Sequence, residues 1–347
     1  MLRPCRRLGR GAAALGRCGK IGGLGGGLRL LRFFVVAVLS SAFIFVAIGA
    51  WQTADRLGDL LTVGSKTAQG DGWPAPETPF DIGFVGDPQA ALGAPFEDIS
   101  IQTELGAAPA WLIAPDDGAP ASKIWAIVVH GIGGRRENGY RFVPAFREAG
   151  MPTMLITYRN DAGAPLSKER LYAFGLTEWP DLEAAVEHAL AAGAGSVVLL
   201  GESMGGGIVG QFVRHSQRRD RVAALLFDAP ALDFPTILDD QMRRAGAPLP
   251  ALLGPAGMRL FGWRSGIDMA DARATDAVAS FPGPVFISHG APDRLVTVAV
   301  SDALVARRAG PTEYLRTEAD HILSFRLDPT AYRAAMDAFL RPVAAAD

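Results

Sequence analysis

A serine set between closely spaced glycines is the first feature of the sequence that could perform chemistry. The stretch GESMGGG covers residues 201–207 and directly follows an apolar run at residues 196–200. Ser203 therefore fits the pattern Gly-x-Ser-x-Gly between an expected strand and an expected helix, where a sharp turn exposes a nucleophilic hydroxyl. Glycine is needed two positions before and after the serine, because a side chain there would collide with the strand or the helix. A plain structural turn is the alternative.

A serine hydroxyl becomes a good nucleophile only when a base accepts its proton. The histidines of the chain, which are the candidate bases, are His130, His188, His215, His289 and His321. His188 and His215 fall within expected helices, and His130 and His289 each stand between a strand and a glycine, which is typical of residues held in turns. His321 lies in a loop after the last expected strand. We therefore expect His321 to be the general base.

A carboxylate must orient the imidazole of such a base. Asp293 lies in HGAPDRLV, the loop after the expected strand at residues 284–288, and is the predicted acid. Asp228 at the end of an earlier strand is the alternative, and Asp320 reads more simply as a helix-capping or solvated residue. Glu202, beside the nucleophile, could tune the base, although an exposed side chain is the simpler interpretation.

The negative charge that develops on a substrate oxygen needs two backbone N–H donors. Met204 should supply one, because it stands at the N-terminus of the expected helix, where free N–H groups and the helix dipole favour an anion. The second should come from the loop HGIGG at residues 130–134. Ile132 is the preferred donor there, with Gly131 and Gly133 as neighbouring alternatives.

Two further residues follow a strand at the same edge of the expected sheet. Tyr158 and Arg159 are candidates to line the substrate pocket, together with Gly131 and Gly133 of the preceding loop. Hydrogen bonding that only fixes their own loop is the alternative interpretation for both.

The elements that must position these residues can be read from the hydrophobic pattern. Apolar β-type runs, separated by helix-like segments, occur at residues 124–129, 153–157, 196–200, 222–227, 284–288 and 312–315. The clearest helical segment is WPDLEAAVEHALAAGAG at residues 179–195. This alternation predicts the α/β class, with a mostly parallel sheet covered by helices on both faces. Two short runs at residues 98–102 and 110–113 predict an N-terminal β-hairpin, and the broken rhythm at residues 232–281 predicts a small helical cap.

The N-terminal region differs from the rest of the chain. Residues 1–32 form a glycine-rich arm with eight basic and no acidic residues, and residues 33–51 contain no charge. Nineteen helical residues span roughly 28 Å, close to the apolar thickness of a bilayer. We expect a transmembrane signal-anchor at 33–51, a cytoplasmic arm, and an extracytoplasmic body. A cleaved signal peptide, with a small-residue site at Ala47-Ile-Gly49 and a secreted product, is the main alternative. A buried helix of a soluble protein is the other.

After this segment, residues 52–95 are rich in Gly, Pro and Asp and predict an irregular stalk or linker, followed by a catalytic domain at residues 96–347. The net charge of −2 gives no indication of a nucleic-acid partner. Both cysteines, Cys5 and Cys18, lie in the arm, so the body can form neither a disulfide nor a cysteine-ligated metal site. The expected chemistry needs no cofactor and no metal.

Four motifs in order carry a resemblance to a known family: HGIGG, GESMGGG, HGAPDRLV and ADHILSF. From about residue 96 the chain resembles serine hydrolases of the α/β-hydrolase fold, in which the nucleophile, acid and base follow the order of Ser203, Asp293 and His321. The resemblance implies that Ile132 and Met204 form the oxyanion hole. Two further segments resemble a bacterial branch of membrane-anchored or secreted hydrolases that are monoacylglycerol-lipase-like or serine-aminopeptidase-like. These segments are TYRNDAGAPLS and GLTEWPDLEAAVEHAL. Ile132 departs from the HGGG loop of some esterases.

These observations lead to an expected function. The sequence predicts a membrane-tethered hydrolase of carboxylic esters, such as acyl lipids or other hydrophobic esters, acting through an acyl-enzyme intermediate. A peptidase or amidase with the same catalytic residues is the alternative, and it would need an acidic cluster in the cap to bind a substrate amino group. Candidate residues for such a cluster are Asp239, Asp240, Asp268 and Asp271. A catalytically silent binding module is a remote alternative, because such a module would have lost one of the three catalytic residues.

Overall fold

The computed structural model describes residues 24–65, 73–119 and 122–345 of the chain. Contacts divide the chain into two units, Met1–Ala47 and Ile48–Asp347. Residues 1–23 of the expected arm, with both cysteines, lie outside the described residues.

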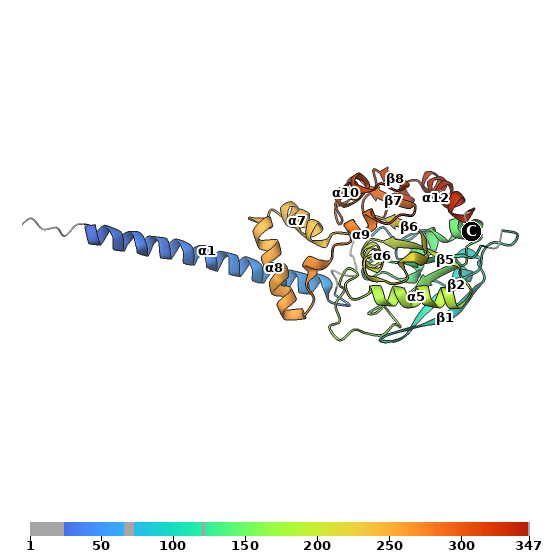
Figure 1. Cartoon of the computed structure of the whole chain (residues 1–347), viewed down its shortest axis with the longest axis horizontal. Helices are drawn as coiled ribbons and strands as arrows, with labels where there is room; N and C mark the ends of the chain where they lie inside the picture. The colour runs from blue at the N-terminus through green and yellow to red at the C-terminus, as the bar shows by residue number, and fades with distance from the viewer. Residues whose placement is uncertain (1–23, 66–72, 120–121, 346–347) are drawn as a thin grey trace, which may run out of the picture. The chain divides into compact units, whose positions relative to one another are not determined.

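An eight-stranded sheet forms the centre of the second unit (Figure 1). Its spatial order is β1-β2-β4-β3-β5-β6-β7-β8; β1 and β2 pair antiparallel, β2 pairs antiparallel with β4, and all other neighbours are parallel. The predicted N-terminal hairpin and mostly parallel sheet are thus confirmed. The strands are β1 (Phe96–Thr103), β2 (Gly106–Ile113), β3 (Ile124–Val129), β4 (Thr153–Ile156), β5 (Ser196–Glu202), β6 (Val222–Asp228), β7 (Val285–Gly290) and β8 (Thr312–Thr317).

Helices cover both faces of this sheet, as the sequence predicts. Successive side chains of a strand point to opposite faces, so Val197 and Leu199 of β5 join one apolar core while Val198 and Leu200 join the other. The first core is completed by α5 (Trp179–Ala191), α6 (Met204–His215), α9 (Thr275–Ala279) and α10 (Ala299–Arg307). The second is completed by α4 (Val143–Glu148) and α12 (Pro329–Ala344).

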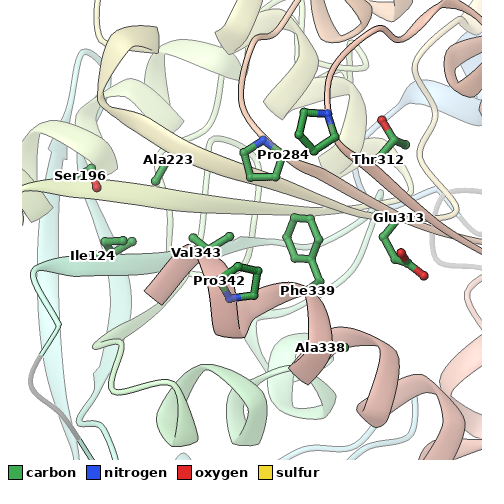
Figure 2. A pocket seen from close by; sticks show the side chains of 11 residues that line it. Ile124, Ser196, Ala223, Pro284, Thr312, Glu313, Ala338, Phe339, Pro342 and Val343 are labelled. Carbon is green, nitrogen blue, oxygen red and sulfur yellow. The ribbon is translucent and has the colours of Figure 1, made fainter. Parts of the chain in front are cut away.

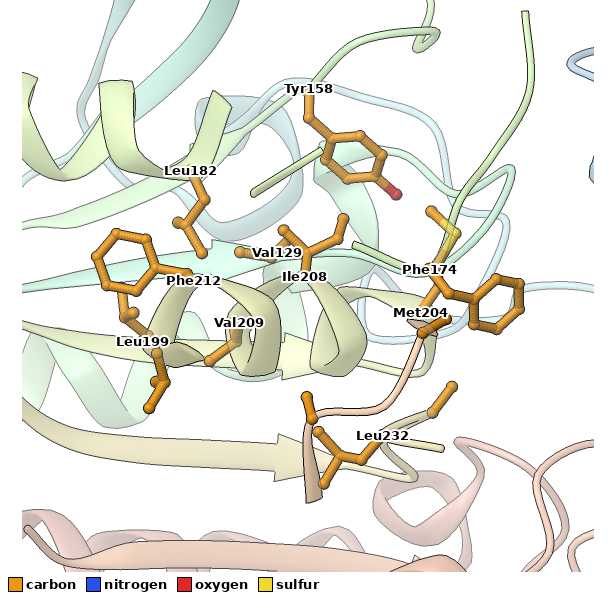
Figure 3. Close-up of a cluster of buried hydrophobic side chains, with 14 of the residues drawn as sticks. Val129, Tyr158, Phe174, Leu182, Leu199, Met204, Ile208, Val209, Phe212 and Leu232 are labelled. Atoms are coloured by element: carbon orange, nitrogen blue, oxygen red, sulfur yellow. The ribbon is translucent and has the colours of Figure 1, made fainter. Parts of the chain in front are cut away.

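Helix α6 is held firmly in the first core. Figure 3 shows Ile208 and Phe212 of α6 among Val129, Leu182 and Leu199, which come from β3, α5 and β5. All five side chains are fully buried. This packing fixes the N-terminus of α6, and with it the position of Ser203.

The small helical cap lies between β6 and β7 in the sequence. It consists of α7 (Phe234–Arg244) and α8 (Pro250–Ser265), followed by the short 3₁₀ turn η3 (Met269–Asp271). Asp233 caps α7 by accepting a hydrogen bond from the Thr236 N–H. The C-terminal part of the predicted insertion, α9, belongs to the sheet-covering layer instead, because Val278 packs in the first core beside α6.

Helix α1 (Leu24–Leu61) continues well past the charge-free run. Ala54, Leu57 and Leu61 are buried in the second unit, and the Tyr172 N–H donates a hydrogen bond to the Leu61 carbonyl. The sequence predicts an irregular stalk from residue 52, but the structure keeps residues 52–61 helical. The physical reason is that every third or fourth residue of this stretch is apolar and packs on the core.

The part of the expected stalk within residues 73–95 also lies against the rest of the second unit. Phe80 contacts Phe325, and the Tyr140 hydroxyl donates a hydrogen bond to the Gly86 carbonyl. Helix α3 (Pro88–Leu92) begins with a side-chain cap from Asp87 and leads into β1. Elsewhere the structure also describes η1 (Arg136–Arg141), η2 (Arg219–Arg221) and α11 (Ser324–Leu327). Proline and glycine make residues 73–95 irregular, but the aromatic side chains of this segment still bury apolar surface.

By length and composition, α1 contains a stretch suited to crossing a membrane, within Gly27–Leu61. A signal sequence near an N-terminus, or a core helix of a soluble protein, satisfies the same criterion. Within the described residues, only 6% of its most apolar window is buried. The low burial distinguishes this stretch from an ordinary core helix.

A cavity of about 700 Å³ opens at the amino ends of the parallel strands. Figure 2 shows Phe339, Pro342 and Val343 of α12 facing Ile124 and Pro284 across it. Ser203 follows the carboxyl end of β5, where ligands bind in sheets of this type. The cavity is therefore at the wrong edge of the sheet to be the site of the predicted chemistry.

Candidate active site

The turn between β5 and α6 holds Ser203 in an unusual backbone conformation. Its φ of 50° is positive, which is strained for a residue other than glycine. A Cβ atom at Gly205 would stand 2.1 Å from the Val129 carbonyl oxygen, and one at Gly201 would stand 2.6 Å from the Gly205 carbonyl oxygen. These distances explain the glycines around Ser203: β3, β5 and α6 meet too closely for side chains.

The structure brings Ser203, His321 and Asp293 together from three separate loops. His321 lies between β8 and α11, and its Nε2 atom is 2.8 Å from Ser203 Oγ. The His321 Nδ1 atom is 2.7 Å from Oδ2 of Asp293, which follows β7. With Nδ1 donating to the carboxylate, Nε2 is left free to accept the serine proton. The side chains are nearly buried, with His321 4% and Asp293 1% exposed.

The carboxylate of Asp293 is surrounded by hydrogen-bond donors. Its Oδ1 atom accepts from the backbone N–H groups of Leu295 and Val296, each at 2.8 Å. Its Oδ2 atom also lies 3.1 Å from Nε2 of His289. Burial by itself would raise the pKa of Asp293, but the hydrogen bonds and charges of the two imidazoles lower it below its ordinary value. The acid is therefore ionised at neutral pH.

His289 is a second imidazole that contacts the Asp293 carboxylate, and the sequence did not predict this contact. Its Nδ1 atom is 2.7 Å from the Ser301 hydroxyl, which fixes the ring so that Nε2 faces Asp293. In the sequence it resembles a turn residue, because a glycine follows it. The available signal was its position four residues before the predicted acid, across a tight turn in which the Asp293 N–H bonds the Gly290 carbonyl.

The two alternative acids have other partners. Asp228 pairs with the buried guanidinium of Arg141, at 2.9 Å. Asp320 accepts hydrogen bonds from the backbone and the guanidinium of Arg294, and from the backbone N–H of His321. Neither carboxylate reaches the His321 ring in the described part of the chain, so the geometry favours Asp293 as its partner.

Glu202 is not the exposed side chain that the simpler interpretation predicts. It is 1% exposed and pairs with Arg141, which also holds Asp228. Its Oε1 atom accepts weak hydrogen bonds from Asn138 Nδ2 at 3.3 Å and from the Gly131 N–H at 3.4 Å. A long-range ion pair that local sequence does not reveal is the reason for its burial. Glu202 thereby links the nucleophile turn to the loop at residues 130–134.

That loop lies directly against the nucleophile. A Cβ atom at Gly131 would be 3.1 Å from the Cβ atom of Ser203, a contact tighter than most, so glycine eases the close approach of the two segments. Gly133 has a φ of 60°, which turns the chain sharply after Ile132. Among the described residues, neither the Ile132 N–H nor the Met204 N–H has a hydrogen-bond acceptor. Neither predicted donor is therefore engaged elsewhere in the described part of the chain.

Tyr158 and Arg159 support loops instead of lining a pocket. The Tyr158 hydroxyl is fully buried and donates to the carbonyls of His130 and Gly131, at 3.1 and 3.0 Å. Burial raises the Tyr158 pKa well above its usual value, so this phenol remains a donor. The Arg159 guanidinium makes a two-pronged contact with Asp181, with both distances at 2.8 Å. Both residues therefore fit the alternative interpretation, in which their hydrogen bonds fix nearby loops.

Trp73 reaches the site from the segment that the sequence predicts to be a stalk. Its ring centroid is 6.2 Å from that of His321. Nearby residues of the same segment are bound by Arg326, which pairs with Glu77 at 3.0 Å and Asp81 at 3.1 Å. No sequence signal connects Trp73 to His321, because the contact depends on how the segment folds back over the body.

Comparison with known proteins supports the architecture. No protein-family model matches the sequence, and no curated protein sequence matches it. Solved structures do match this chain. The Pyrococcus furiosus esterase Pf2001 is 18% identical in sequence and has a TM-score of 0.57, and the match covers 79% of this chain and 99% of that chain. The chain has the α/β-hydrolase fold. Est1E from Butyrivibrio proteoclasticus, with ferulic acid bound, is 20% identical, with a TM-score of 0.56 over 71% and 99% of the two chains.

A third α/β-hydrolase structure provides a contrast at the cap. XC6422 from Xanthomonas campestris, described as a serine hydrolase without a lid, is 17% identical, with a TM-score of 0.51 over 71% of this chain and 94% of that one. This chain inserts α7 and α8 between β6 and β7. Ser203 follows β5, Asp293 follows β7 and His321 follows β8, so the three residues come in the serine, acid, histidine order that catalytic residues have on this fold.

Proposed function

We propose that the chain is a serine hydrolase of carboxylic esters, with Ser203 as nucleophile, His321 as general base and Asp293 as the orienting acid. The observation that carries the proposal is the continuous hydrogen-bonded chain from Ser203 Oγ through His321 to Asp293. At the Ser203 side of this chain, two backbone N–H groups have no acceptor among the described residues: that of Met204, which follows Ser203, and that of Ile132, in the loop that lies against it. We assign these two N–H groups to the oxyanion hole within this proposal.

The geometry supports a two-step mechanism. Ser203 Oγ attacks the ester carbonyl while His321 Nε2 takes the hydroxyl proton, and the carbonyl oxygen becomes an oxyanion bound by the Ile132 and Met204 N–H groups. The tetrahedral intermediate collapses, the C–O bond to the alcohol breaks, and His321 donates the proton to the departing oxygen. Water then attacks the acyl-enzyme by the same route, with Asp293 stabilising the imidazolium at each step.

A hydrophobic ester is the substrate class that the surroundings favour. The indole of Trp73 lies beside His321, so an acyl or alcohol group near the base would meet an apolar surface. The names of the structural neighbours describe esterases, and one of them contains bound ferulic acid. Within this proposal, α1 tethers the enzyme to a membrane, with the arm in the cytoplasm and the body outside. Acyl lipids are then within reach.

Three of the four acidic cap residues that the peptidase alternative would use are engaged with partners inside the cap. Asp239 and Asp240 pair with arginines one helical turn further along α7, Arg243 and Arg244. Asp268 accepts a hydrogen bond from the backbone N–H of Ala270. These three carboxylates are engaged within the cap, which leaves Asp271 alone, with no side-chain partner among the described residues, to bind a substrate amino group.

The direct test is labelling of the purified full chain with a fluorophosphonate, which reacts with activated serines. We expect the native chain to be labelled and Ser203→Ala to lose all labelling. Ser216→Ala serves as the matched control, because it removes another buried serine hydroxyl at the far end of α6 and should label normally. A panel of p-nitrophenyl esters, monoacylglycerols and aminoacyl amides then compares esters with amides. Labelling that persists in Ser203→Ala would refute the nucleophile assignment.

A further inference from the structure

Helix α8 of the cap carries large apolar side chains on its exposed face as well as on its buried face. Leu253, Met258 and Phe261 are buried, whereas Leu252 is 47% and Trp263 is 83% exposed. Large apolar side chains exposed next to one another often mark a surface that binds a protein or a membrane. The outer face of α8 therefore indicates a partner outside the described body.

The contact between α8 and α1 indicates what that partner is. A Cβ atom at Gly49 would be 2.7 Å from Leu253 Cδ2, and one at Gly257 would be 2.4 Å from Thr53 Cβ, so glycines allow the two helices to touch. Gly49 lies at the end of the charge-free run of residues 33–51, and Thr53 lies two residues beyond it. If this run crosses a bilayer, α8 contacts α1 where the chain leaves the apolar layer.

The residues on the outer face of α8 are those that favour a lipid surface. Leu252, Arg259 and Trp263 follow one another at spacings of seven and four, which places them on one side of the helix. Tryptophan is enriched at the boundary between apolar and polar lipid regions, and arginine extends its charge to the headgroups from an apolar stem. Helix α8 also carries Arg264 and no acidic residue. Such composition is typical of helices that lie in the interface.

We propose that the outer face of α8, formed by Leu252, Arg259 and Trp263, binds the surface of the bilayer in which α1 is anchored. This proposal rests on the membrane tether in the proposed function. The cap is joined to the catalytic loop, because Gln241 of α7 donates a hydrogen bond to the Leu295 carbonyl, two residues after Asp293. A cap in contact with lipid thus lies next to the site that would hydrolyse a lipid ester.

The test uses the full chain with Cys5 and Cys18 changed to serine, reconstituted in phosphatidylcholine vesicles with and without phosphatidylglycerol. Single cysteines carrying an environment-sensitive fluorophore are placed at Leu252 and Trp263. Leu327 is the matched control, because it is 57% exposed on α11, beside the second core and away from α8. Phe43, 74% exposed on α1, reports the tether. Quenching by lipid-borne nitroxide is compared with quenching by aqueous iodide.

We expect the labels at residues 43, 252 and 263 to be quenched by the nitroxide and the label at residue 327 by iodide. If residues 252 and 263 respond to iodide while residue 43 responds to the nitroxide, the surface proposal is wrong and the tether stands. If the label at residue 43 is also quenched by iodide, α1 is not anchored in the bilayer, and both the tether and the surface proposal are wrong. Protection of residues 252 and 263 from both quenchers would replace lipid by a protein partner, such as a second copy.

A kinetic comparison tests the consequence for catalysis. Trp263→Asp should lower the rate on a long-chain ester dispersed in vesicles by roughly tenfold, because a charge on this face opposes contact with lipid. The rate on a soluble short-chain ester should stay unchanged, and Leu327→Asp should affect neither rate. Equal losses on both esters would overturn the proposal, since they would indicate damage to the active site instead of lost surface binding.

Discussion

Asp293→Asn isolates the role of the acid, because it replaces one carboxylate oxygen by an amide nitrogen at nearly constant volume. The side-chain oxygen of the asparagine is expected to stay on the N–H groups of Leu295 and Val296, which now bind Oδ1 at 2.8 Å. The amide NH₂ group must then face His321 Nδ1, where Oδ2 now lies at 2.7 Å. Since NH₂ can only donate, Nδ1 must become an acceptor.

The change of tautomer moves the imidazole proton to Nε2, the atom that lies 2.8 Å from Ser203 Oγ. A protonated Nε2 cannot accept the serine proton, so the nucleophile loses its base. The corresponding substitution in the chymotrypsin-type triad lowers kcat by about 10⁴, or about 5.5 kcal/mol of transition-state stabilisation. We expect a loss of similar size here, with KM changed much less than kcat.

Steady-state hydrolysis of a soluble p-nitrophenyl ester measures the effect. Asp320→Asn and Asp228→Asn are the controls, because each removes an alternative acid of the same type. Asp320→Asn should retain activity within about tenfold, because its carboxylate supports Arg294 and the loop. Circular dichroism of each variant shows that it is folded. If Asp293→Asn keeps more than a tenth of the native kcat while folded Asp228→Asn falls by 10³ or more, the assignment of the acid is wrong.

Two further predictions concern stability. Arg141→Met should lower the free energy of unfolding by about 3–5 kcal/mol, because it leaves Glu202 and Asp228 as adjacent buried carboxylates, and Glu202→Gln in the same chain should restore part of the loss. Denaturant melts check this, and an unchanged midpoint for Arg141→Met would contradict it. Because the pKa of Asp293 is lower in the folded chain, its contribution to stability is complete above the unfolded value of about 3.9 and is lost as pH falls below it. Acid melts of Asp293→Asn should therefore show a shallower pH dependence, and an identical slope would argue against that shift.

The strands and the nucleophile turn were predictable because local chemistry determines them. Runs of β-branched and apolar residues marked the expected strand at residues 124–129, which matches β3. The glycines at positions 201 and 205 are local signals of close backbone packing around Ser203. Chain order then placed Asp293 and His321 on loops that a parallel sheet brings to the same edge.

The sequence could not reveal contacts made by burial between distant segments. Glu202 looked exposed because its partner Arg141 is sixty-one positions away. His289 looked like a turn residue because its ring is fixed by Ser301 and directed at Asp293 only in the folded chain. Trp73 carried no local signal at all.

The sequence by itself determined the alternation of strands and helices, the strained turn at Ser203, and the order of nucleophile, acid and base. Tertiary structure alone decided that Asp293, and not Asp228 or Asp320, faces His321, and that α1 continues into the body beside α8. The physical reason is that periodicity and backbone sterics act between neighbouring residues, whereas ion pairing and burial depend on which surfaces the whole chain brings together.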